Sequence, residues 1–273
     1  MSVFSTSRPI PPSPDRSNWI DPPGLSAAIG LIVLYFLLQA VSSGLIALLM
    51  AVASGFVKID GGVHPVGAGI RTMLEEPGMP ATVVMLTLGL AAVVVVALVR
   101  RKWPALWSMA RPPGLGMLLP ANPAFFALAI AVGVAAPLLG GLLTSLLANG
   151  RTVTQDVQNL GVHTPLGLRL ALVIVVTSVG PLVEEILFRG VLLSALTKRW
   201  RIGWSVSISS LLFAVSHLPS MQWQWYALPD LMLLASVLAW LRLRTGSLWP
   251  SVLAHGVNNL LAVAAWFAAA VSA

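Results

Sequence analysis

The chain has 273 residues, of which 57% are hydrophobic and only 9% are charged. A typical soluble domain carries roughly 25% charged residues, so this composition excludes a soluble globular protein and indicates an integral membrane protein. The net charge of +7 does not indicate a nucleic-acid partner, because membrane proteins gather Lys and Arg in cytoplasmic loops, and the absence of cysteine excludes disulfide bonds and thiolate chemistry.

The chain begins with a polar, Pro-rich segment, residues 1–23, which we expect to be disordered. Seven apolar segments follow, and a membrane span needs about 20 apolar residues. We expect them all to be helices, because lipid contains no water to satisfy exposed backbone groups. The predicted segments are 25–54, 81–99, 123–147, 166–196, 202–218, 226–241 and 247–271.

The fourth segment is too long for one straight span. Gly180 and Pro181 lie inside it and predict a break or a kink, with Ser178 as a candidate cap of the helix that follows. Two shorter helices there would raise the helix count by one. The predicted fold is therefore an all-α, polytopic membrane helix bundle with about seven to eight transmembrane helices and an intramembrane polar cavity.

The distribution of Lys and Arg predicts the orientation. With the N-terminus in the cytoplasm, the inside segments hold eleven of these residues and the outside segments hold four, as the positive-inside rule requires. We expect the protein to lie in a bacterial cell (inner) membrane, because the chain is compact and rich in Ala, Val and Leu. We also expect the cavity to open toward the cytoplasmic leaflet, where the basic loops lie.

Three charged side chains lie together inside an apolar stretch: Glu184, Glu185 and Arg189. A charged group at membrane depth is costly, so it is paired, faces a polar cavity or takes part in chemistry. Glu185 and Arg189 are four residues apart and share one helix face, so they can form a pair. Glu184 points about 100° away, lacks that partner and is free to act as a general base.

Two more polar sets follow in apolar helices. Phe213 and His217 are four residues apart, and His255 and Asn259 are one turn apart on the last segment. With Glu184 they form a candidate hydrolytic site, in which Glu184 takes a proton from water while the histidines and Asn259 hold the water or stabilise an oxyanion. Two histidines and one glutamate also match a catalytic zinc site.

Each of these features also has a purely structural explanation. A buried Glu–Arg pair can lock helices together, and a histidine in a membrane helix can bind a neighbouring helix. All three sets in one order favour a functional site. Of the remaining residues, Asp230 is expected at the outer end of the sixth segment, and Gly140 and Gly141 at a close helix contact.

The three sets, in this order, resemble the motifs of the type II CAAX prenyl endopeptidase family, the Ras-converting-enzyme-like proteins. The bacterial branch of that family is also called CPBP. Its pattern is EExxxR, then FxxxH, then HxxxN, and the resemblance covers roughly residues 165–265. The matching residues here are Glu184, Glu185, Arg189, Phe213, His217, His255 and Asn259.

The resemblance implies a role for each matching residue. The residue matching Glu184 activates water, and those matching Glu185 and Arg189 support it. The residue matching His217 orients the water or the transition state.

The last pair, His255 and Asn259, matches the proposed oxyanion site. The resemblance implies a reaction that needs no cofactor, with zinc held by His217, His255 and Glu184 as the alternative. It also divides the chain into the tail (1–23), N-terminal transmembrane helices (24–160) and a CPBP/CAAX-protease-like catalytic core (161–273).

We therefore expect an intramembrane endopeptidase that hydrolyses peptide bonds of a membrane-associated or hydrophobic peptide. Its partners would be a peptide or protein substrate and the lipid bilayer, with no nucleic acid. The main alternative is a non-catalytic membrane immunity or scaffold protein of the same fold. A small transporter is a third reading, because Glu, His and Arg inside a membrane also relay protons, but no inverted repeat is evident.

Overall fold

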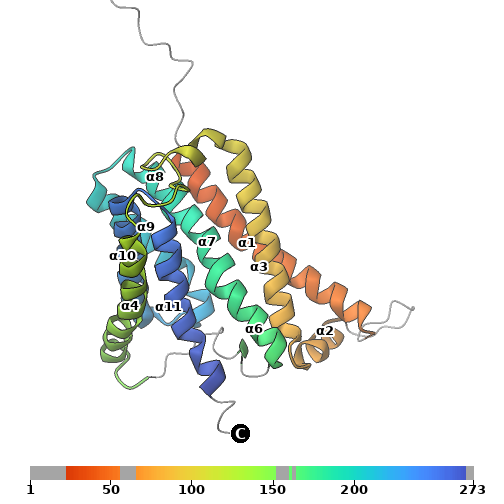
Figure 1. Ribbon diagram of the computed structural model, residues 1–273. Helices are drawn as coiled ribbons and strands as arrows, with labels where there is room; N and C mark the ends of the chain where they lie inside the picture. Colours follow the sequence, from red (N-terminus) through yellow and green to blue (C-terminus); the bar gives the residue numbers. More distant parts are fainter. Residues whose placement is uncertain (1–22, 56–65, 152–159, 162–163, 269–273) are drawn as a thin grey trace, which may run out of the picture.

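The structure is a computed structural model, and it describes residues 23–55, 66–151, 160–161 and 164–268. These residues form helices joined by turns and loops, without a strand among them, so the all-α prediction is confirmed (Figure 1). Residues 1–22 of the predicted N-terminal tail lie outside the described residues. The α-helices are α1 (Leu25–Ala53), α2 (Val66–Glu75), α3 (Met79–Lys102), α4 (Ala124–Ala148), α6 (Leu166–Ile174), α7 (Gly180–Glu185), α8 (Leu193–Thr197), α9 (Ile202–Ser216), α10 (Leu228–Thr245) and α11 (Trp249–Ala268).

The predicted apolar segments coincide with these helices. Within the described residues, five helical stretches are long and apolar enough to cross a membrane, and α9 is a shorter apolar helix. The chain is thus an integral membrane protein. Helix α2 was not predicted, because it is short and carries no long apolar run. The five stretches are Leu25–Ala53, Met79–Lys102, Ala124–Ala148, Leu166–Thr197 and Trp225–Thr245.

Large apolar side chains cover the outside of the bundle. Val41, Val93 and Leu138 are each more than 60% exposed, although they lie in the middle of long helices. In water such a surface would be unfavourable, whereas in a bilayer it faces acyl chains. The helices therefore need no polar outer face, which is why sequence periodicity alone does not show which side is buried.

The fourth predicted segment is one continuous helix rather than two. Its α-helical pieces α6, α7 and α8 are joined by two π-helical stretches, Val175–Val179 and Ile186–Leu192. Of the break or kink expected at Gly180 and Pro181, the break is therefore wrong. Because the helix continues, Ser178 does not cap it, and its hydroxyl donates to the carbonyl of Ile174 instead. We call this 32-residue helix, Leu166–Thr197, the central helix.

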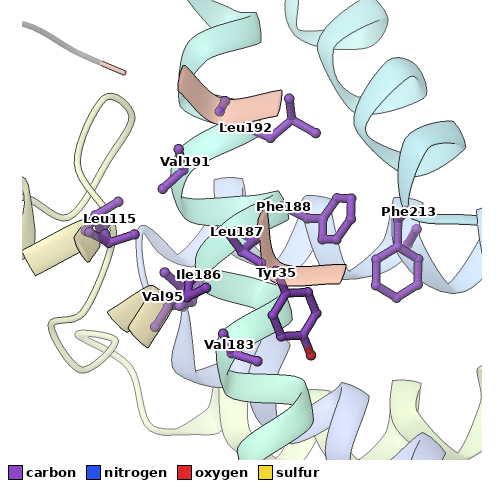
Figure 2. Close-up of a cluster of buried hydrophobic side chains, with 14 of the residues drawn as sticks. Tyr35, Val95, Leu115, Val183, Ile186, Leu187, Phe188, Val191, Leu192 and Phe213 are labelled. Carbon is purple, nitrogen blue, oxygen red and sulfur yellow. The ribbon is translucent and has the colours of Figure 1, made fainter. Parts of the chain in front are cut away.

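The central helix lies in the largest buried cluster. Figure 2 shows its apolar side chains packed against residues of α1, α3 and α9 and of the loop after α3. Since lipid is as apolar as Leu, this packing stabilises the bundle through close contact more than through the hydrophobic effect. Residues of the cluster in Figure 2 are Tyr35, Val95, Leu115, Val183, Ile186, Leu187, Phe188, Val191, Leu192 and Phe213.

The loop between α3 and α4 covers the turn between α10 and α11. The Arg242 guanidinium donates to the carbonyl of Gly114 at 2.7 Å, and the Trp249 indole donates to the carbonyl of Met117 at 2.9 Å. This end of the bundle also carries the basic C-terminus of α3 and the α8–α9 turn (Figure 1). We call it the basic end.

Candidate active site

A cavity of about 460 Å³ lies inside the bundle, which is a usual size for a ligand site. It is lined by α1, α4, α9, α10, α11 and the middle of the central helix. The three sequence motifs, which are far apart in the chain, meet at this cavity. Its polar lining residues are Tyr35, Gln39, Glu184, Ser216, His217, Ser220, Asp230, His255, Asn258 and Asn259.

Glu184 lies between the two histidines. Its Oε2 is 3.5 Å from Nε2 of His217 and 3.8 Å from Nε2 of His255. The side chain is 15% exposed, so it faces the cavity rather than the packed core. Both imidazoles therefore present the same ring nitrogen to one carboxylate oxygen.

The hydrogen bonds behind His217 determine which of its nitrogens carries the proton. Its Nδ1 is 2.8 Å from the carbonyl oxygen of Phe213. A carbonyl only accepts, so Nδ1 donates and Nε2 of the neutral ring is an acceptor. His217 directly follows α9, where backbone carbonyls lack helical partners. The four-residue spacing of Phe213 and His217 thus matches this hydrogen bond.

His255 is oriented in the same way by a carboxylate. Its Nδ1 is 3.1 Å from Oε1 of Glu185, which also accepts a hydrogen bond from Arg189 at 2.9 Å. Nδ1 of His255 therefore donates to Glu185, and its Nε2 is directed toward Glu184. A carboxylate that fixes the tautomer of a histidine is a common arrangement in catalytic sites.

Glu185 and Arg189 form the predicted pair, and both are buried behind the cavity wall. Their side chains are 0% and 1% exposed. The Arg189 guanidinium also donates to the carbonyl of Ala235 at 3.1 Å and lies 4.5 Å from the ring centre of Phe213. The pair therefore connects the central helix to α9, α10 and α11, and it does not line the cavity.

Asn259 contacts the central helix rather than Glu184. Its Nδ2 donates to the carbonyl of Val176 at 2.9 Å. In this π-helical stretch the N–H of Gly180 bonds to Val175, five residues back, so Val176 would be the partner of residue 181. Pro181 has no N–H, and Asn259 supplies the missing donor. One of the two amide hydrogens of Asn259 is thus used structurally, and its side chain still lines the cavity.

Two residues of α1 also belong to the site, and the sequence analysis missed them. Tyr35 and Gln39 line the cavity together with Glu184, and the Tyr35 hydroxyl is near enough to the Glu184 carboxylate to interact with it electrostatically. Tyr35 is 1% exposed and belongs to the buried cluster (Figure 2). Tyr35 and Gln39 are four residues apart and therefore share one face of α1, which is the sequence feature that could have indicated them. Tyrosine is common in apolar helices, so this spacing alone did not predict a site.

The cavity extends from Glu184 away from the basic end. On the central helix its lining runs back to Val176, and on α11 it runs from His255 to Val263. On α10 it reaches Asp230 in the first turn, and exposed Ser220 lies in the adjoining loop. The lining therefore extends in the direction opposite to the one that the basic loops led us to expect.

The separations within the site are somewhat longer than those between the ligands of a zinc ion. A tetrahedral zinc ion with bonds of about 2.0–2.1 Å places its ligands roughly 3.3–3.4 Å apart. The separations of Glu184 from His217 and His255 are 3.5 and 3.8 Å. Across the part of the chain that the structure describes, no group of three or more His, Cys, Asp or Glu residues is arranged to hold a metal ion.

The C-terminal part of the chain is similar to a known protein family. No curated protein and no solved structure matched the chain. Residues 166–261 match the family model described as type II CAAX prenyl endopeptidase Rce1-like. This range begins with the central helix and includes all six candidate site residues named from the sequence. The chain therefore contains an Rce1-like type II CAAX prenyl endopeptidase domain at residues 166–261.

Proposed function

We propose that the protein is an intramembrane endopeptidase, in which Glu184 activates a water molecule to hydrolyse a peptide bond of a membrane-associated or hydrophobic substrate. One observation carries the proposal. The Glu184 carboxylate faces the cavity between Nε2 of His217 and Nε2 of His255, and the tautomer of each histidine is determined by the hydrogen bond of its Nδ1. The Rce1-like domain supports the same reaction class.

The water would bind between Glu184 and His217. The carboxylate oxygen and Nε2 of the neutral imidazole are both acceptors, and 3.5 Å separates them. They cannot bond directly without a proton, but one water molecule can donate a hydrogen to each. Glu184 then takes a proton from this water while the water oxygen attacks the carbonyl carbon of the substrate.

Attack converts the carbonyl into a tetrahedral intermediate with a negatively charged oxygen. The second amide hydrogen of Asn259, and Nε2 of His255 when it is protonated, are the candidate donors to this oxygen. Glu184 then gives its proton to the amide nitrogen, the C–N bond breaks, and the products are a carboxylate and an amine. Tyr35 acts as a positioning residue that holds the Glu184 carboxylate through this cycle.

A comparison of wild type with Glu184→Gln tests the proposal. Both proteins, in liposomes, would receive internally quenched hydrophobic peptides, with and without a chelator. We expect Glu184→Gln to remain folded and to lose at least about a thousandfold in kcat/KM, and wild type to keep its activity with chelator. Glu75→Gln, at an exposed position on α2, is the matched control and should behave as wild type.

Three other results would lead to different conclusions. Equal cleavage by Glu184→Gln would contradict the mechanism. Loss of wild-type activity with chelator would favour zinc held by Glu184, His217 and His255. Binding of a partner without cleavage, unaffected by substitution of His217, would favour the non-catalytic scaffold.

We propose further that the N-terminus is cytoplasmic and that the protein lies in a bacterial inner membrane. The basic end would then face the cytoplasm, and the cavity would extend toward the opposite side. The chain has no cysteine, so a single Ser220→Cys substitution gives a unique label site. A membrane-impermeant maleimide should label it in intact cells, whereas labelling only after lysis would contradict this orientation.

A further inference from the structure

A second carboxylate lines the same cavity as Glu184. Asp230 is the third residue of α10, and its side chain is half-buried in the cavity wall. Among the described residues, no cation and no hydrogen-bond donor contacts this carboxylate. Asp230 lies in the first turn of α10, where the helix dipole favours an anion, but its residue type is not needed to cap the helix, which has no side-chain cap. Asp230 is therefore available to a ligand.

The charge of the described cavity lining is one-sided. Glu184 and Asp230 contribute two carboxylates, whereas Lys and Arg are absent from the described residues of the wall. The two lining histidines are directed toward Glu184, and the Arg189 guanidinium is buried behind the wall in its pair with Glu185. A substrate group beside Asp230 thus meets a negative charge that no Lys or Arg of the described wall neutralises, and this charge attracts a cation and repels a carboxylate.

The neighbouring helix α4 makes room for this carboxylate. A side chain added at Gly140 would overlap Oδ1 of Asp230, whereas one added at Gly141 would meet open space. The absence of a side chain at Gly140 therefore allows the acid to occupy its present position in the cavity wall. This pair of adjacent glycines supplies a test of that position that leaves the acid itself in place.

We propose that Asp230 is a specificity-determining residue that binds a cationic nitrogen of the substrate. The preferred substrates would then be hydrophobic peptides that carry a Lys or Arg side chain or a free amino terminus within the cavity. This inference rests on the proposed function, because it places the peptide in the cavity that contains Glu184. A hydrogen bond between charged groups in such a site changes kcat/KM by about ten- to a hundredfold.

The test uses quenched peptides that share one hydrophobic sequence. At one scanned position they carry Lys, the neutral near-isostere norleucine, or Glu, each with an acetylated or a free amino terminus. We expect wild type to cleave the Lys or the free-amine peptide about tenfold faster than its neutral match. The acetylated and free-amine series distinguish the two sources of charge.

Variants at the site should change this preference in opposite directions. Asp230→Asn should bring the Lys-to-norleucine ratio of kcat/KM close to one, and Asp230→Lys should favour the Glu peptide. Gly140→Ala should weaken the preference by displacing the carboxylate, whereas Gly141→Ala should match wild type. An unchanged ratio in Asp230→Asn, or no reversal in a folded Asp230→Lys, would overturn the proposal.

A binding experiment tests the cation site independently of peptide-bond hydrolysis. Fluorescently labelled forms of the same peptides would be titrated against Glu184→Gln alone and combined with Asp230→Asn. Tighter binding of the Lys or free-amine peptide that is lost with Asp230→Asn would support the cation site even if no peptide is cleaved. Equal affinity of the charged and neutral peptides in both proteins would overturn it.

Discussion

Removal of Arg189 should destabilise the protein far more than removal of the whole Glu185–Arg189 pair. Both side chains are buried, and their atoms approach to 2.9 Å. Among the described residues, loss of Arg189 leaves the buried Glu185 carboxylate without a charged partner and with only the N–H of His255 to stabilise it, which costs about 3–5 kcal/mol. Replacing both by apolar residues removes both desolvation penalties, although the N–H of His255 loses its acceptor, so Glu185→Leu with Arg189→Leu should stay within about 2 kcal/mol of wild type.

Thermal unfolding in detergent, followed by tryptophan fluorescence, would measure these differences. A change of 1 kcal/mol moves Tm by about 2–4 °C in a chain of roughly this size, so Arg189→Leu should lower Tm by roughly 6–20 °C. The exposed residues Arg71 and Glu75 on α2 have the same chemistry and spacing, and their substitution should change stability by less than about 0.5 kcal/mol. The reasoning is refuted if the shift of the double variant equals the sum of the two single shifts.

Two further predictions test the surroundings of Glu184 and His255. Tyr35→Phe should lower kcat by about ten- to a hundredfold, since the interaction of a hydroxyl donor with a charged group contributes about 1.5–3 kcal/mol, with little change in KM or Tm; unchanged kcat would exclude a positioning role. Gly256→Ala should destabilise the protein by about 1–3 kcal/mol, because the added methyl group would overlap the backbone carbonyl of Thr177. It should also reduce activity, because Gly256 directly follows His255 in the chain. Gly203→Ala, which meets open space on α9, is the matched control for both readouts, and equal Tm values for the two alanine variants would contradict the predicted overlap.

Local spacing was sufficient to predict parts of the site. The four-residue spacing of Glu185 and Arg189 predicted their pair, since i and i+4 share a helix face. Long apolar runs predicted the helices, because only a helix satisfies its own backbone in lipid. The three motifs also meet at one cavity, although their order in the chain carried no distance information.

Contacts between distant segments could not be predicted in this way. Tyr35 reaches Glu184 across about 150 residues of chain, and no spacing rule connects them. The π-helical stretches have no recognisable periodicity over so few residues, so Gly180 and Pro181 were interpreted as a break. The direction of the cavity depends on which helix ends are open, and the basic loops alone did not indicate it.

The two π-helical stretches lie on either side of two adjacent glutamates that face different environments. Glu184 faces a cavity and Glu185 faces a sealed ion pair. A one-residue shift on an α-helix turns every side chain by about 100°, so a single insertion between Pro181 and Glu184 would turn Glu184 into the direction that Glu185 now takes. Such a change would place the Glu184 carboxylate in the core and would turn Glu185 and Arg189 away from the buried site that they now share. We therefore expect this stretch to tolerate side-chain substitutions better than changes of length, and we expect insertions and deletions to be tolerated only in the loops that join the helices.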